Sequence, residues 1–435
     1  MTSRRSVLAT GAAAAGLAGF AAWSRPAAPA SHPPAFAGDA LFRDVLAYDA
    51  LGVHRTGGPA DRATARWLAG ALHAGGFAVR AQRFAVRQFL PERVALSVGG
   101  RAFAAHPQWP VAGPDLRVAA PLRELGRGGE GRPWIALVEL PYDRRARMDL
   151  PAYRERLDAA RAQGATAAVA ATPGPTGGII VMNPPRAGGD LPLPVLLARG
   201  DDLAALRRAA ASGGAASLEW RGRIEPAAPA RNLVGTRGGR GRWIVVSTPM
   251  SGWTRAAGER GGGVALWRAV AASAARLGDR RVMMVATSGH ELAHAGAGAL
   301  LPALRPLIER HGLDCWFHLG ANVATRDWMA EDGRLRLLDR AHEGRHLMAS
   351  AALLPSLAWC FAGERGLTPT PLLPGLPAGE LETLARHGFS PVAGIFGSSL
   401  THHVALDRPD VATSPALLET VGRGLWRFLA GRASG

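Results

Sequence analysis

The stretch TSGHELAHAGAG, residues 287–298, contains the pattern H-E-x-x-H in His290, Glu291 and His294. On a helix, this spacing puts two histidines on successive turns, where they can bind one zinc ion with the glutamate as general base. The chemistry of the pattern therefore depends on the secondary structure in which it lies.

The residues around the pattern favour a loop. The run 281–286 has the composition of a β-strand, so His290 follows the strand closely, behind Thr-Ser-Gly. Gly296 and Gly298 come directly after the pattern and weaken any helix centred on it. We predict a loop at the exit of a strand, which does not form the helical zinc-protease arrangement.

Apolar strands alternate with helical segments from residue 242 onward. In chain order they read WIVVST, GVALWRAVAASAARLG, RVMMVATS, a helical region and CWFHLGA. This alternation predicts an α/β fold with a mainly parallel central sheet and helices on both faces. Functional loops of such sheets lie beyond the carboxyl ends of the strands. Here those loops are residues 247–263, 287–296 and 318–328.

The region before this alternation divides into two parts. Residues 38–89 have the pattern helix, loop, helix and strand, with the second helix opened by Pro59 and ended by Gly75-Gly76. Residues 90–230 resemble a separate small α/β unit, with strands at 134–138 and 166–172 around a helix at 151–163. We predict one domain made of residues 38–89 and 231–435, interrupted by an inserted domain of residues 90–230.

The order of these loops resembles the zinc aminopeptidase and glutaminyl cyclase superfamily, in the variant with an inserted protease-associated domain. GGPADRATARWLAGAL resembles the N-terminal segment of that family, and ALVEL with LPVLLARGDDLAALRRA resembles the insert. ARNLVGTRGG resembles the return into the sheet. The resemblance covers nearly all of the chain after residue 37. It implies a pair of zinc ions and a glutamate general base.

Part of the family's ligand pattern is missing from this sequence. In VVSTPMS, Pro249 stands at the position of a histidine ligand and Ser251 at that of its aspartate partner. In CWFHLGA, Gly320 stands where the family has an aspartate ligand. The resemblance thus implies that one zinc ion has lost its private ligands, Pro249 and Gly320 being unable to replace them.

The positions of the ligands of the other zinc ion still carry carboxylate or imidazole side chains. Glu259 takes the place of the bridging aspartate, Glu291 that of a glutamate ligand, and His403 that of the last histidine. Three ligands and an open position suit a catalytic zinc ion. His290 stands where the family has its glutamate base, and an imidazole can accept a proton at neutral pH. Candidate substitutes for a ligand are His294, His318, His387 and His402.

The N-terminus and the charge predict where the protein acts. Arg4 and Arg5 precede a short apolar run that resembles a twin-arginine export signal, so residues 1–37 are predicted to be signal and linker. We expect a periplasmic or extracellular protein without a membrane span after the signal. There, Cys315 and Cys360 could pair or stay as buried free thiols. The net charge of +17 comes from interspersed arginines without a basic block, which argues against a nucleic-acid partner.

The leading hypothesis is an exported hydrolase that acts on a peptide or small amide with one zinc ion. Glu259, Glu291 and His403 would bind the metal, and His290 would be the catalytic base. The alternative is a catalytically inactive binding protein on the same fold, because ligand positions are lost. A further alternative is metal-free chemistry by Ser251 or Ser288 with His290, although the sequence has no nucleophile elbow.

Overall fold

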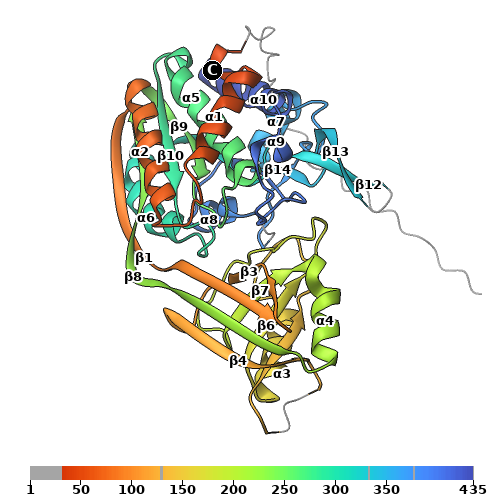
Figure 1. Ribbon diagram of the computed structural model, residues 1–435. Coiled ribbons are helices and arrows are strands. Elements are labelled where there is room, and N and C mark those ends of the chain that lie inside the picture. Colours follow the sequence, from red (N-terminus) through yellow and green to blue (C-terminus); the bar gives the residue numbers. More distant parts are fainter. Residues whose placement is uncertain (1–31, 128–130, 332–333, 376–377, 435) are drawn as a thin grey trace, which may run out of the picture. The chain divides into compact units, whose positions relative to one another are not determined.

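Parallel strands form the centre of the large sheet, as the alternation of strands and helices predicts (Figure 1). A computed structural model describes residues 32–127, 131–331, 334–375 and 378–434. The parallel neighbours are, in spatial order, β16 (Val392–Gly397), β11 (Leu313–Leu319), β9 (Arg240–Pro249) and β10 (Arg280–Thr287). Outside β16 lie β14 (Arg345–Ala349), which is antiparallel to it, and β15 (Pro369–Pro371).

Helices cover both faces of this sheet, which confirms the predicted α/β fold. One face packs in a single apolar core with α1 (Gly38–Ala50), α2 (Pro59–Ala74), α5 (Gly262–Ser273) and α10 (Pro415–Ser434). The other face packs against α6 (Ala295–His311) and α8 (Glu380–Arg386). The strands are buried from both sides, and this explains why they are continuously apolar.

The helix α2 shows how local signals set these elements. It begins at Pro59, whose fixed φ suits the first turn, and it ends before Gly75. Leu68 and Leu72 lie one turn apart on its inner face, and both are fully buried. The predicted second helix of this region is therefore confirmed.

Two long strands carry the chain away from the central sheet. β1 (Ala78–Val98) and β8 (Ala215–Arg237) pair antiparallel along nearly their whole length, and β8 also pairs with β10. The predicted domain boundaries at residues 90 and 230 fall inside these strands. The backbone pairing is thus continuous from the central sheet into the region between them, where β4 (Asp115–Glu124) adds to β8.

The region between β1 and β8 packs in two apolar clusters, which also include Trp253 and Val404 from the chain after β8. Its strands are β2 (Arg101–Phe103), β3 (Ala105–Pro107), β5 (Trp134–Glu139), β6 (Ala165–Thr172) and β7 (Val195–Arg199), and its helices are α3 (Pro151–Ala162) and α4 (Leu203–Ala211). These elements match the strands and helix predicted at 134–138, 151–163 and 166–172. Its likeness to a protease-associated domain stays a prediction.

A further hairpin consists of β12 (Arg326–Glu331) and β13 (Arg334–Ala341), and two further short helices are α7 (Leu354–Cys360) and α9 (Pro409–Ala412). Cys315 and Cys360 are buried free thiols. No helix within the described residues has the length and apolarity needed to cross a bilayer.

The predicted signal and linker comprise residues 1–37, with the signal ending near residue 30 or 37, and positions 1–31 lie outside the described residues. Phe36 is fully buried, and its ring centroid lies 5.5 Å from that of Trp426 in α10. The residues just before α1 therefore belong to the core of the fold.

Candidate functional site

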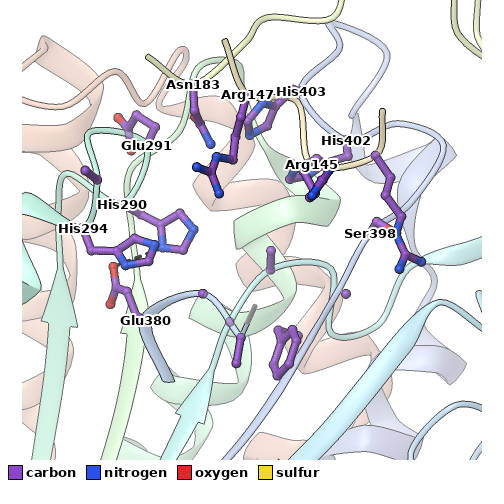
Figure 2. A pocket seen from close by; sticks show the side chains of 18 of the residues that line it. Arg145, Arg147, Asn183, His290, Glu291, His294, Glu380, Ser398, His402 and His403 are labelled. Atoms are coloured by element: carbon purple, nitrogen blue, oxygen red, sulfur yellow. Dashed lines mark hydrogen bonds and ion pairs between the residues drawn. The ribbon is translucent and has the colours of Figure 1, made fainter. Parts of the chain in front are cut away.

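A pocket of about 610 Å³ opens at the carboxyl ends of the central strands (Figure 2). Loops that follow β10, β11 and β16 line it, together with the segments 143–147 and 183–186 from the region between β1 and β8. In Figure 2, His290, His294 and Glu380 group on one side, and Arg145, His402 and His403 on the other. The pocket thus lies where a parallel sheet of this kind places its functional loops.

The H-E-x-x-H stretch forms a turn, as predicted, and not a helix. β10 ends at Thr287, residues 290–294 form turns, and α6 begins only at Ala295. His294 has a φ of 62°, in the left-handed region, so its backbone is outside the right-handed helical conformation. The ring centroids of His290 and His294 lie 4.7 Å apart. Nδ1 of His294 is hydrogen-bonded to the hydroxyl of Thr383.

His290 forms a dyad with Glu380, the first residue of α8. Nδ1 of His290 lies 3.1 Å from Oε1 of Glu380, and the hydroxyl of Thr287 donates to Oε2 at 2.7 Å. A carboxylate can only accept, so Nδ1 carries the proton and Nε2 is left with a lone pair. Burial, and then the positive charge of Arg260, hold the pKa of His290 well below its usual range. His290 is therefore a neutral base oriented by Glu380.

Glu259 lies in a π-helical turn, Ala257–Gly261, that leads into α5. The carboxylate of Asp407 accepts hydrogen bonds from the backbone N–H groups of Gly258 and Glu259, at 2.8 and 3.0 Å. Gly258 has no room for a side chain, because a Cβ there would lie 2.7 Å from Oδ1 of Asp407. Burial raises the pKa of Asp407 to about 7. Asp407 thus fixes the turn by accepting two backbone hydrogen bonds.

Glu259, His402 and His403 form a group of buried or nearly buried ligand atoms that lie within 4.8 Å of one another. Nε2 of His403 lies 3.3 Å and Nδ1 of His402 3.9 Å from Oε1 of Glu259. Nδ1 of His403 donates to the carbonyl of Val181 at 2.7 Å, an arrangement that in the neutral tautomer leaves the lone pair on Nε2. Nδ1 of His402 accepts from the side-chain amide of Asn322 at 3.2 Å. The group is therefore a set that could hold a metal ion.

Arg260 is the cation next to this group. Its Nη2 lies 2.7 Å from Oε1 of Glu259, with both side chains fully buried. Burial opposes ionisation of Glu259, but Arg260 and the neighbouring histidines outweigh it and hold the pKa of this carboxyl well below its usual range. Burial lowers the pKa of His402 to about 3, so that imidazole is neutral.

Glu291, the third predicted ligand, is turned to another part of the site. The backbone N–H and hydroxyl of Thr56 donate to Oε1, at 3.2 and 2.5 Å, and the hydroxyl of Ser251 donates to Oε2 at 2.7 Å. The structure therefore brings together Glu259 and His403, with His402, and leaves Glu291 outside that group. Glu291 instead ties the loop after β9 to the segment before α2.

The two serines, and the positions where ligands of the family are missing, take part in hydrogen bonds, strand pairing or close packing. Ser251 donates to Glu291, and Ser288 donates to Asp61 at 2.9 Å, so neither hydroxyl is bonded to His290. Pro249 ends β9 and pairs with Thr287 of β10. A Cβ at Gly320 would lie 2.9 Å from Cβ of Phe396, so packing leaves no room for a ligand side chain there.

The sequence gives no signal for one part of the site and only a weak one for another. Glu380 lies 90 residues from His290, and no pattern around it marks it as a partner. His402 was only one of several candidate substitutes, and its neighbour His403 was the predicted ligand. The signal available was adjacency: two consecutive histidines on a tight turn can face the same site.

The fold resembles solved zinc aminopeptidase structures. BSAP, a zinc aminopeptidase from Bacillus subtilis, is 17% identical, with 90% of this chain and 94% of that chain covered and a TM-score of 0.68. A peptidase M28 precursor from Shewanella amazonensis is 14% identical, covering 90% and 92%, with a TM-score of 0.67. An aminopeptidase from Aneurinibacillus is 15% identical, covering 91% and 93%, with a TM-score of 0.59. No protein-family model matches the sequence, and no curated protein matches it.

These likenesses define the class of fold. The chain has a zinc-aminopeptidase-like α/β fold, with a mainly parallel sheet covered by helices. At this level of identity the likeness extends to the fold alone, and the chemistry has to be argued from the pocket.

Proposed function

We propose that the protein is an exported hydrolase that cleaves a peptide or amide bond with one zinc ion. The observation that carries the proposal is the buried contact between Glu259 and His403. Their Oε1 and Nε2 atoms lie 3.3 Å apart, and neither carboxylate oxygen has a hydrogen-bond partner within the described chain. Oε1 also faces the guanidinium of Arg260 at 2.7 Å, and in the neutral Nδ1–H tautomer the lone pair of Nε2 points to the same oxygen, where a metal ion would stabilise both atoms.

The donor set suits zinc. One carboxylate and two imidazoles are the ligands of a known type of catalytic zinc site, in which the fourth position stays open. Glu259, His402 and His403 would hold the ion. Nδ1 of His402 would then bind the metal in place of accepting a hydrogen bond from the side-chain amide of Asn322. We assign His402 in place of Glu291, whose oxygens already accept hydrogen bonds from Thr56 and Ser251. Bound zinc would polarise the carbonyl of a substrate.

His290 is proposed as the general base. Its Nε2 would accept a proton from water as the water oxygen bonds to the carbonyl carbon, and would return that proton to the amine nitrogen as the C–N bond breaks. Glu380 holds the imidazole in the tautomer this requires, through the contact of 3.1 Å to Nδ1. The lowered pKa of His290 keeps it unprotonated at neutral pH.

The pocket supports a small substrate or the end of a peptide. Its volume of about 610 Å³ lies within the usual range of small-molecule sites. Similarity to BSAP and to the other aminopeptidases favours a peptide. For export, we propose cleavage of the signal after Ala28-Pro29-Ala30 and not near residue 37, since the earlier site leaves the buried Phe36 in the mature chain.

Metal content tests the proposal. The folded protein is loaded with zinc, separated from excess and measured by elemental mass spectrometry, as are His403→Ala, His402→Ala and Glu291→Ala. We expect one zinc ion in the wild type and in Glu291→Ala, and loss of zinc in both histidine variants. His294→Ala is the matched control, because that histidine lines the same pocket outside the proposed ligand set.

Three results would overturn the assignment. Wild-type protein that holds no zinc after loading would rule out the metal, and zinc retained in His403→Ala would place it elsewhere. Zinc lost in Glu291→Ala but kept in His402→Ala would restore the ligand set predicted from the sequence. A panel of aminoacyl amides and peptides then tests turnover, which His290→Ala is expected to abolish.

A further inference from the structure

Arg260 is a cation that the fold holds permanently beside the proposed metal site. Its Nε donates to the carbonyl of Ser251 at 2.9 Å, which anchors the guanidinium to the loop after β9. The residue belongs to the turn before α5, and the next residue, Gly261, packs so closely on α1 that an added Cβ would lie 3.2 Å from Val45. A side chain enclosed in this way cannot move to solvent without opening the fold.

The guanidinium and the carboxylate of Glu259 balance each other in charge but leave polar atoms without hydrogen bonds. Nη2 of Arg260 lies 2.7 Å from Oε1 of Glu259. Even so, Nη1 and Nη2 of Arg260 and both oxygens of Glu259 lack hydrogen-bond partners within the described chain. The pair is thus balanced in charge, while its polar atoms stay available to something else.

We propose that Arg260 is an internal competitor for the metal: it balances Glu259 when no ion is bound, weakens zinc binding, and excludes a second ion. This inference rests on the zinc site proposed above. It makes Arg260 the residue that sets metal affinity and stoichiometry, while Glu259, His402 and His403 supply the ligand atoms.

Charge explains the proposed effect. Glu259 and Arg260 together carry no net charge, so a zinc ion brings two uncompensated positive charges into a buried site. Uncompensated buried charge is strongly unfavourable. A second ion would double that charge, and Pro249 and Gly320 offer it no ligand atom. Without Arg260, the carboxylate of Glu259 would offset half the charge of the first ion.

Zinc binding by neutral variants tests this inference. Dissociation constant and stoichiometry are measured by titration calorimetry and equilibrium dialysis for the wild type, Arg260→Met and Arg260→Gln. The two neutral variants are expected to bind zinc at least about 100-fold more tightly than the wild type, because a unit charge roughly 4 Å away is removed. Arg260→Lys keeps the charge and is expected to stay within about tenfold of the wild type.

Arg255→Met is the matched control, since Arg255 lies on the same loop but pairs with Asp49 at the surface at 3.0 Å. Its zinc affinity should equal that of the wild type. Neutral variants that fold, by circular dichroism, but bind zinc no more tightly than the wild type would overturn the inference. So would Arg260→Lys if it bound as tightly as Arg260→Met.

The inference and the proposed function can fail separately. If the wild type binds no zinc but Arg260→Met does, the single-zinc function is wrong and the competition is supported. If the wild type binds one ion and Arg260→Met binds with the same affinity, the function stands and the competition is wrong.

Discussion

Removing the charge of Glu259 should destabilise the protein more than an ordinary buried substitution. Glu259→Gln leaves the guanidinium of Arg260 charged and fully buried without its partner. The contact of 2.7 Å between Nη2 and Oε1 places the charge centres roughly 4 Å apart, where the attraction is about 4 kcal/mol at an effective dielectric constant near 20. Breaking one side of a buried pair typically costs about 3–5 kcal/mol.

We therefore expect Glu259→Gln to lower the free energy of unfolding by about 4 kcal/mol in metal-free buffer. In the double variant Glu259→Gln with Arg260→Met, no buried charge remains unpaired, and at least about 2 kcal/mol should return. Urea unfolding followed by tryptophan fluorescence measures both, together with Arg260→Met alone. A loss below about 1 kcal/mol in Glu259→Gln, or a double variant whose loss equals the sum of the two single losses, would refute this reasoning.

Three other predictions concern the base, the core and the turn. Glu380→Gln removes the anionic acceptor from Nδ1 of His290 and should lower kcat on the order of 100-fold or more with little change in KM; a loss below about threefold in steady-state kinetics would contradict the dyad. Burial raises the pKa of Asp61 to about 7, so its contribution to stability is full below pH 4 and is lost as the pH rises toward 7. Asp61→Asn removes this pH-dependent loss. The unfolding free energy of the variant relative to the wild type should therefore rise by up to about 4 kcal/mol between pH 4 and pH 8. A difference that stays constant with pH would contradict the raised pKa of Asp61. Gly258→Ala should lose about 1–3 kcal/mol on urea unfolding, because its Cβ would lie 2.6 Å from the nearest side chain. The control Gly70→Ala, in an exposed part of α2 with nothing within 4 Å, should gain about 0.5–1 kcal/mol, and equal effects of the two changes would contradict the packing argument.

The sequence alone determined the order of the elements and the edge of the sheet at which the site lies. Continuous apolar strands between amphipathic helices can satisfy their burial only in a covered parallel sheet, so WIVVST and RVMMVATS predicted two strands of such a sheet. The loop position of His290 was predicted from the strand that ends just before it and from Gly296 and Gly298 after the pattern. Both glycines lie inside α6, so it is the exit of β10 at Thr287, and not these glycines, that supports the loop.

Tertiary structure decided which side chains meet. His290 and Glu291 are adjacent in sequence, yet one contacts Glu380 and the other Thr56, because successive residues of a turn point in different directions. The exchange of Glu291 for His402 in the ligand-forming group depends on the backbone path of two distant loops, which no spacing in the sequence encodes. The ion pair of Arg260 with Glu259 likewise depends on burial. At the surface water would screen the two charges, and only a buried pair can change the affinity for a metal ion.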